Sequence, residues 1–228
     1  MPMYRAVNKN FFKKWTPEMS YVLGFFAADG YITVNRRGGQ FWCIQITDKG
    51  LLETIKKTVQ SNHKIGMRKR KSNESGIYRL QIGSIEMCDD LRNLGFVERK
   101  TKNLSVRKMP NQYFSDFVRG YFDGDGNVWS GVTKKHRKTP SLTLLTAFTS
   151  CSRKFLTFLL KELNRQGIEG GSIYDSKGNY SRLQFGTRDS LKLYDFMYNQ
   201  STSSGLQLLR KKVVFEKFQT MRKNAVVV

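Results

Sequence analysis

The chain has 228 residues, and its 40 lysines and arginines against 18 aspartates and glutamates give a formal net charge of +22. This excess points to a polyanionic partner, and nucleic acid is favoured over an anionic membrane because the sequence shows neither an amphipathic basic helix nor a lipid-anchor signal. The lack of an apolar run that could span a membrane, and of an apolar secretory core in residues 1–15, predicts a soluble intracellular protein.

The first predicted element is a helix over residues 16–29. Thr16 is a suitable N-cap, Pro17 fits the first helical position, and Glu18 places an acid in the first turn. Residues 21–28 are apolar on nearly every side of such a helix. This pattern predicts a helix that is buried all round.

Strands and two further helices are predicted for the rest of the first half. Ile44 and Ile46 alternate with more polar neighbours, which is the pattern of a half-exposed sheet. An amphipathic helix and a second hairpin follow. In chain order the predicted elements are strands 31–35 and 41–47, helix 51–60, strands 64–70 and 77–82, and helix 85–94.

The second half repeats this order, so that the chain predicts an αββαββα unit twice. Its elements are helix 112–125 with Asn111 before it, strands 127–133 and 141–149, helix 153–166, strands 172–175 and 180–185, and helix 189–198. We therefore expect an α+β fold made by pseudo-twofold duplication, with two antiparallel, saddle-like sheets and the first helix of each half packed at the centre. The halves are predicted as residues 1–106 and 107–228.

Two pairs of similar segments indicate that the chain is an internal duplication. Residues 22–30, VLGFFAADG, recur as residues 118–126, VRGYFDGDG, at an offset of 96. Residues 79–84, RLQIGS, recur as residues 182–187, RLQFGT, at an offset of 103. The second copy therefore carries about seven extra residues between the two landmarks, most of them in the basic stretch 130–141.

Acidic residues at the ends of the two apolar helices indicate a metal site. Gly24 and Gly120 lack side chains, so the helices can approach closely and bring Asp29 and Asp125 together. Two carboxylates at the negative ends of helix dipoles repel each other unless a cation neutralises them. A hard divalent ion such as Mg²⁺ meets this need, and Mn²⁺ or Ca²⁺ is expected to substitute for it in binding.

The glycines after the two acids complete the predicted site. Gly30 and Gly126 suit a left-handed cap just past each helix, which would leave the carbonyl oxygens of Ala28 and Gly124 as further metal ligands. Cysteine and histidine offer no alternative centre, because the three cysteines and two histidines are widely scattered. Any chemistry therefore falls to carboxylates, amines and bound ions.

The two nine-residue segments, each ending a buried helix with Asp-Gly, resemble the signature motifs of the LAGLIDADG homing endonucleases. The resemblance covers most of the chain. It implies a monomeric nuclease without an obligate protein partner, which cuts both strands of a long, asymmetric target in double-stranded DNA. Metal ions at Asp29 and Asp125 would then activate water and stabilise the leaving oxygen.

One position departs from the family motif. The first segment has Ala27 where the second has Asp123. Because this position is not a metal ligand in the family, the departure does not contradict activity. Asp123 is interpreted as a helix-end or supporting group.

The family also uses basic residues beside the metal site, and the resemblance implies catalytic candidates here. Lys100 and Lys211 follow the last predicted helix of each half in similar contexts, and Lys49 with Asp48 follows a predicted strand. The corresponding stretch 150–152 of the second half has no lysine, which would make cleavage of the two strands unequal. A solvated or phosphate-binding cation is an equal alternative for each lysine.

A sheet with helices on one face leaves its other face free to enter the major groove of DNA. The outward side chains that suit base reading are Gln45, Arg79 and Gln81 in the first half and Thr143, Arg182 and Gln184 in the second. Cations in the predicted hairpin loops are expected to bind phosphate or to follow the groove; they are Arg36, Arg37, Arg68, Arg70, Lys134, Lys135, Arg137 and Lys138. Trp42 and Trp129 are expected in the core beneath the sheets, with contact to DNA bases as the alternative.

Two alternatives stay open. Proteins of the same fold can act as RNA intron maturases or as DNA-binding regulators that do not cut. The presence of both Asp29 and Asp125 argues against the loss of cleavage. The start at Met1 and the lack of splicing-domain sequence favour a protein that is not embedded in a host protein, whereas the host intron or gene is left open.

Overall fold

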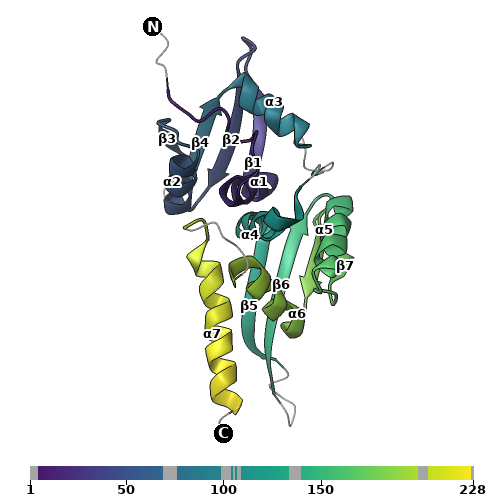
Figure 1. Ribbon diagram of the computed structural model, residues 1–228. Helices are drawn as coiled ribbons and strands as arrows, with labels where there is room; N and C mark the ends of the chain where they lie inside the picture. The colour runs from purple at the N-terminus through teal and green to yellow at the C-terminus, as the bar shows by residue number, and fades with distance from the viewer. Residues whose placement is uncertain are drawn as a thin grey trace. The chain divides into compact units, whose positions relative to one another are not determined.

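The structure is a computed structural model that describes residues 5–68, 76–98, 104, 106, 109–133, 140–199 and 205–226. It divides into two compact units, residues 1–124 with 202–206 and residues 125–201 with 207–228. Each unit holds one four-stranded antiparallel sheet (Figure 1), so the predicted α+β class is confirmed. The duplication boundary between residues 106 and 107 stays a prediction. Within the described ranges, no helix is both long and apolar enough to cross a membrane.

Helix α1, Pro17–Asp29, begins and ends where the sequence predicts. The Thr16 hydroxyl accepts a hydrogen bond of 3.1 Å from the backbone N–H of Met19, which satisfies one of the donors that a helix start leaves open. Residues 19–27 are all buried, so the prediction of a helix buried all round is confirmed.

The left-handed caps predicted at the two Asp-Gly steps are wrong. Gly30 has an extended backbone, with φ −92° and ψ 159°, and begins strand β1. Gly126 begins strand β5, and its φ is not positive either. Gly30 is required for space instead, because a Cβ there would clash with the ring of Phe26. Each helix therefore passes directly into a strand.

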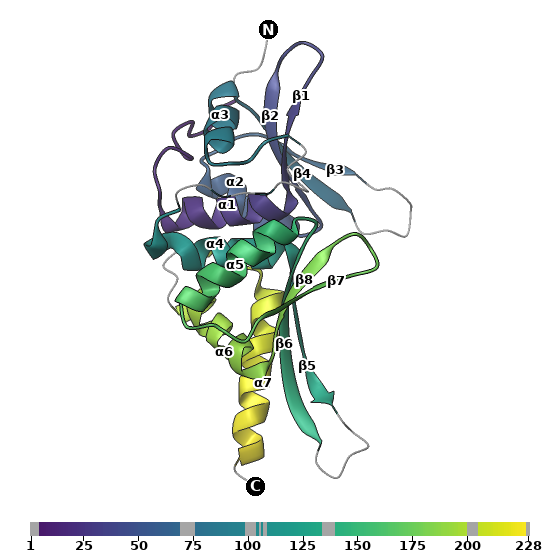
Figure 2. The same ribbon diagram turned by 90° about the vertical axis from the view of Figure 1, so that its right-hand side faces the viewer.

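Sheet 1 lies in the first unit and has the strand order β1-β2-β4-β3. Its strands are β1 Gly30–Val34, β2 Gln40–Ile46, β3 Ile65–Arg68 and β4 Ile77–Gly83. Helices α2, Lys49–Thr58, and α3, Ile85–Asn93, pack with α1 on one face of the sheet. Figure 2 shows these helices on one side of the strands. The fully buried side chains of this face are Trp42, Ile44, Leu80 and Ile82.

The second apolar helix starts later than predicted. Asn111–Tyr113 forms a 3-10 turn, and α4 runs from Phe114 to Asp125. Asn111 therefore lies inside the turn and does not precede a regular helix. The turn follows Pro110, whose φ is −65°, and tight turns of this kind are frequent at helix starts.

Sheet 2 lies in the second unit and has the strand order β5-β6-β8-β7. Its strands are β5 Gly126–Thr133, β6 Ser141–Ser150, β7 Ser172–Asp175 and β8 Ser181–Phe185. Its helices are α5 Arg153–Arg165, α6 Thr187–Tyr194, a π-helical turn Asp195–Asn199 and α7 Leu209–Val226. The predicted order of strands and helices is thus confirmed in both halves, apart from α7.

The two sheets share one register, which supports the predicted duplication. Gly30 pairs with Ile44, which pairs with Leu80; in sheet 2, Gly126 pairs with Phe148, which pairs with Leu183. The partner of Gly30 lies 14 positions later and the partner of Gly126 lies 22 positions later. The β5–β6 hairpin is therefore eight residues longer than the β1–β2 hairpin. The second half has one residue fewer than the first between the paired positions of its two inner strands, which leaves the net difference of seven seen in the sequence.

Helix α7 was not predicted and has no counterpart in the described part of the first half. It packs on β5 and α6 and buries Phe215 and Phe218. Leu208, just before it and in the same unit, is also buried. The helix therefore belongs to the core of the second unit, although its sequence is rich in cations.

Candidate functional site

Helices α1 and α4 pack in direct backbone contact within the first unit, which contains α4 as far as Gly124. A Cβ on Gly24 would clash with the carbonyl group of Phe117, and a Cβ on Gly120 would clash with that of Tyr21. Backbone atoms cannot turn aside as a flexible side chain can. The close helix approach predicted from Gly24 and Gly120 is therefore confirmed.

The end of α1 lies against the last turn of α4. A Cβ on Gly124 would clash with the Cβ of Ala28 and would lie 3.1 Å from Oδ2 of Asp29. The carboxylate of Asp29 is thus held beside Gly124, and it is half-buried. Asp125, the other predicted metal ligand, is the last residue of α4 and the first residue of the second unit, and it is also half-buried.

The predicted donor set suits a hard divalent cation. It consists of the Asp29 and Asp125 carboxylates and the backbone carbonyls of Ala28 and Gly124. Mg²⁺ binds through one or two carboxylates and keeps several waters, whereas a structural zinc site takes four side-chain ligands and a catalytic one three. Among the residues that the structure describes, no group of three or more His, Cys, Asp or Glu side chains could hold a metal. Magnesium or calcium therefore fits these donors better than zinc.

The sequence predicts Lys211 just after the last helix of the second half. In the structure Lys211 lies within a further helix, α7. Its side chain is buried, with 7% exposure, which is unusual for a lysine. The ammonium donates a hydrogen bond of 2.6 Å to the carbonyl oxygen of Gly126. A desolvated cation is therefore fixed one residue from Asp125, within the second unit. Its catalytic role stays a prediction.

Asp48 and Lys49 occupy the start of α2. Oδ1 of Asp48 accepts a hydrogen bond of 2.9 Å from the N–H of Leu51 and caps the helix. Lys49 is more than half exposed and forms an ion pair of 3.3 Å with Glu53. These contacts give both residues structural roles, and their catalytic roles stay predictions.

The second half has a cation at the position equivalent to Lys49. Ser152 caps α5 as Asp48 caps α2, with a hydrogen bond of 3.3 Å from the N–H of Phe155 to its hydroxyl. Arg153, the next residue, therefore corresponds to Lys49. The second half indeed has no lysine at this place. The two halves therefore differ in the type of cation, lysine in one and arginine in the other, and both have a cation there.

A cluster of buried polar side chains joins α1 and α4 in the first unit. The hydroxyl of Tyr21 donates a hydrogen bond of 2.7 Å to Oδ2 of Asp123, which is 2% exposed. Arg119 pairs with Asp116 at 3.2 Å, and its guanidinium lies 5.2 Å from the centroid of the Tyr21 ring. Asp123 thus supports the contact between the helices, which is in keeping with the supporting role predicted for it.

The uncovered face of sheet 1, called the open face of sheet 1, carries the predicted base-reading residues. Gln45 pairs with Arg79, and Cys43 pairs with Gln81, so these side chains point to the side opposite Ile44 and Leu80. Arg79 is exposed, whereas Gln45 and Gln81 are half-buried. Burial raises the pKa of the Cys43 thiol to about 11, so this cysteine stays protonated in the face.

The open face of sheet 2 presents an equivalent set. Thr149 pairs with Arg182 and Ala147 with Gln184, which matches the positions of Arg79 and Gln81 in sheet 1. The hydroxyl of exposed Tyr174 donates a hydrogen bond of 2.8 Å to Oε1 of Gln184 and so orients its amide.

Trp129 lies on this same open face, so its predicted place in the core is wrong. It pairs with Leu145, on the side opposite the buried Leu144 and Thr146, and is 45% exposed. Its ring lies along the strand where Gly131 leaves room. Trp42, in contrast, is fully buried as predicted. The alternation of outward and inward side chains along strand residues 127–133 could have predicted that Trp129 points outward.

Some of the other predicted site residues are described by the structure, and the rest are not. Arg36 and Arg37 are exposed in the β1–β2 turn, where Oδ1 of Asn35 accepts a hydrogen bond of 2.9 Å from the N–H of Arg37. Arg68 is exposed at the end of β3, and Thr143 is bonded through its hydroxyl to Thr133 at 2.7 Å. The remaining predicted residues lie outside the described residues; they are Arg70, Lys100, Lys134, Lys135, Arg137 and Lys138.

The chain is thus a duplicated α+β protein whose two motif helices are in glycine contact and end in acid, with open sheet faces that carry Arg and Gln. Residues 16–102 match the model of the LAGLIDADG-like domain. The chain is 24% identical over 214 residues to an uncharacterized protein of Methanocaldococcus jannaschii, which covers 86% of this chain and 71% of that protein. It is 30% identical over 115 residues to a component of the A-type ATP synthase of Methanopyrus kandleri, which covers 50% of this chain but only 10% of that protein.

Solved structures of similar fold cover nearly the whole chain. The meganuclease I-AabMI bound to uncleaved DNA gives a TM-score of 0.63 at 14% identity, over 93% of this chain and 92% of that one. The homing endonuclease I-LtrWI bound to target DNA gives 0.62 at 12%, over 95% and 92%. I-SmaMI bound to uncleaved DNA in the presence of calcium ions gives 0.60 at 13%, over 94% of each.

Residues 16–102 therefore resemble the LAGLIDADG-like domain, and the chain has the fold of the LAGLIDADG endonucleases along nearly its whole length. The resemblance read from the two motifs is confirmed at this level. At these identities the similarity to the solved structures concerns the fold.

Proposed function

We propose that this protein is a homing endonuclease that makes site-specific double-strand breaks in a long, asymmetric DNA target. The observation that carries the proposal is the glycine contact between α1 and α4, which holds the carboxylate of Asp29 beside the turn that leads into Asp125. A nuclease of the related fold needs two acids at this place. The charge of +22 supplies the affinity for DNA.

Asp29 and Asp125 are proposed to hold the divalent cation, with backbone carbonyls of Ala28 and Gly124 as further ligands. When bound, such an ion activates water for attack on the scissile phosphate and stabilises the leaving oxygen. Lys211 holds the carbonyl of Gly126 and so fixes the chain just after Asp125. As a buried cation, it also offsets the negative charge that collects on the phosphate during attack.

The open faces of the two sheets are proposed to read the target. Arginine recognises guanine and glutamine recognises adenine through paired hydrogen bonds in the major groove. Each face presents one arginine and one glutamine at the same register, Arg79 with Gln81 and Arg182 with Gln184. Arg36, Arg37 and Arg68 at the strand ends are placed to meet phosphates.

The test starts from a randomised duplex library incubated with the protein and Mg²⁺, in which the cleaved sequences are read out. Asp29→Asn and Asp125→Asn should each abolish double-strand cleavage of the selected target and leave its specific binding largely unchanged, because the amide keeps the shape but loses the charge. Asp89→Asn, at an exposed acid of α3, is the matched control and should cut normally.

The outcomes separate the proposed function from its alternatives. Undiminished cutting by either active-site variant would contradict the metal assignment. A wild-type protein that binds a selected duplex tightly without cutting it would be a DNA-binding regulator. A protein that binds a structured intron RNA and leaves all duplexes intact would be a maturase.

A further inference from the structure

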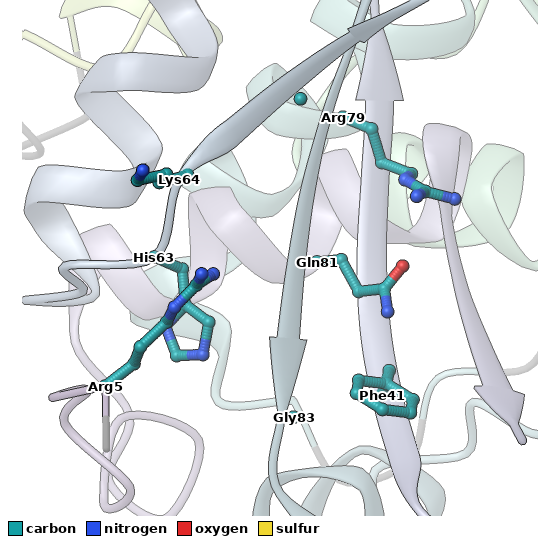
Figure 3. A pocket seen from close by; sticks show the side chains of 8 residues that line it. Arg5, Phe41, His63, Lys64, Arg79, Gln81 and Gly83 are labelled. Atoms are coloured by element: carbon teal, nitrogen blue, oxygen red, sulfur yellow. The ribbon is translucent and has the colours of Figure 1, made fainter. Parts of the chain in front are cut away.

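A hollow of about 380 Å³ lies on the open face of sheet 1. Strand β3 begins only at Ile65, which pairs with Leu80, so the end of β4 is paired with β2 on one side and has no β3 residue on the other. The segment around Arg5 and the loop before β3 form the opposite wall. Figure 3 shows Phe41, Gln81 and Arg79 on one side of this hollow and Arg5, His63 and Lys64 on the other. Its size falls in the range of roughly 300–1,000 Å³ that is typical of small-ligand sites.

The walls of the hollow are strongly cationic. Arg5, Lys64 and Arg79 line it, and they come from three separate segments of the first unit. The charged groups of the described lining are all positive, since neither Asp nor Glu is among them. Three cations in a described lining that contains no acid favour a ligand that carries a phosphate.

An imidazole lies beside these cations. His63 is 7% exposed, and its Nδ1 shares a hydrogen bond of 2.8 Å with the hydroxyl of Ser61. Burial lowers the pKa of His63, and the positive charges of Arg5 and Lys56 lower it further. Its Nε2 has no hydrogen-bond partner among the described residues, so this nitrogen is left for a ligand.

An aromatic ring and an amide complete the wall on the sheet side. The ring of Phe41 packs on the backbone of Gly83, since a Cβ on Gly83 would lie 3.1 Å from Cε1 of that ring. A ring fixed in this way offers its free face for stacking by a base. Gln81 lies next to it and can form the paired hydrogen bonds that recognise a base edge.

We propose that this hollow binds a single nucleotide, with its base against Phe41 and Gln81 and its phosphate on Arg5 and Lys64. Two sources of such a nucleotide share this chemistry. It is either a nucleotide turned out of the stack of the bound duplex, which rests on the proposed function, or a free mononucleotide, which does not. Gly66 makes either possible, because the position facing the hollow has no side chain.

Substitution of Gly66 provides a plug for the hollow. A Cβ there would have only the carbonyl oxygen of Arg79, at 3.9 Å, within van der Waals distance. Gly66→Leu should therefore fill the space without disturbing the fold, which an unchanged melting temperature checks. Met67→Leu is the matched control, because it alters the adjacent and exposed position of the same strand and does not line the hollow.

The first experiment tests free mononucleotides by NMR. The chain has two histidines, so the imidazole signals of His63 and His136 can be assigned by single substitution. Deoxynucleoside monophosphates should shift the His63 signal and not that of His136, and inorganic phosphate should do so more weakly. Gly66→Leu should abolish the shift, Met67→Leu should retain it, and Arg5→Gln or Lys64→Gln should weaken binding by about ten- to a hundredfold.

The second experiment places a fluorescent aminopurine at successive positions of the selected duplex. A base turned out of the stack should raise the fluorescence at one position, and Gly66→Leu should remove this rise. Binding of monophosphates without such a rise assigns the hollow to a free nucleotide. If neither the His63 signal nor any aminopurine position responds, the proposal is overturned while cleavage of duplex DNA can still be intact. If monophosphates bind but no duplex is bound or cut, the proposed function fails and the nucleotide site stands.

Discussion

Replacement of Gly120 by alanine tests the contact on which the proposed site depends. The added Cβ would lie 2.9 Å from the backbone nitrogen of Phe25 and closer still to the carbonyl oxygen of Tyr21, whereas ordinary contact begins at 3.4 Å. Both neighbours are backbone atoms of α1, so no side-chain rotation relieves the clash. The two helices would have to move apart by well over 0.5 Å along a fully buried seam.

The size of the effect follows from this rigidity. Overpacking of a protein core costs about 1–3 kcal/mol when side chains can adjust. Here only the backbone can adjust, so we expect a loss of about 3 kcal/mol in the free energy of unfolding. For a chain of this length that corresponds to a fall in melting temperature of roughly 6–12 °C.

The assay is thermal unfolding followed by circular dichroism, with Gly50→Ala as the control. Gly50 lies in the first turn of α2, and a Cβ there would have only the Asp48 carboxylate, at 3.6 Å, near it. Alanine should therefore leave the protein equally stable or stabilise it by up to about 1 kcal/mol. A Gly120→Ala protein that melts within about 2 °C of the wild type would refute the close-contact argument.

Three further predictions use single side chains. Because the pKa of His63 is lowered below its ordinary value of 6.5, the folded state disfavours its protonation; stability is therefore full above pH 6.5 and falls as the pH drops below it. His63→Gln should flatten that fall in urea unfolding between pH 7 and 5, and an unchanged slope would contradict it. Trp129→Ala should weaken DNA binding about tenfold at an unchanged melting temperature. A clear fall in the melting temperature would contradict the exposed position of this ring. A thiol reagent at pH 8 should modify one cysteine of the native protein, Cys151, and all three in urea, since Cys43 and Cys88 are buried with pKa values raised to about 11. Rapid reaction of a second native thiol would refute this.

The regular elements could be predicted because local signals agree with the tertiary structure. The cap at Thr16, the alternation around Ile44 and the repeated motifs each occur where the strand or helix does. Helix α7 was missed because its buried side chains, Phe215 and Phe218, lie among charged residues that mask the apolar face. Only its partners in sheet 2 make the helix necessary.

The errors at the candidate site share a different physical cause. Asp-Gly at a helix end predicts a left-handed cap from local preference, but Gly30 is selected by the ring of Phe26 four residues earlier. Trp129 was expected in the core together with Trp42, although its register on β5 puts it on the open face. Arg153 was overlooked because its equivalence to Lys49 depends on helix starts and not on sequence similarity. A spatial neighbour decides the first case, the strand register the second and the position of the helix start the third.

The shared register also bears on how an asymmetric target would be read. Arg79 and Arg182, and likewise Gln81 and Gln184, hold identical places on the third strand of each sheet. Edge positions differ, since Thr33 of β1 corresponds to Trp129 of β5. The same side chain at the same register of the two sheets favours the same base, and different side chains favour different bases. The two half-sites should therefore be most alike opposite the inner strands and diverge opposite the edges, where the longer β5–β6 hairpin and Trp129 extend the second face alone.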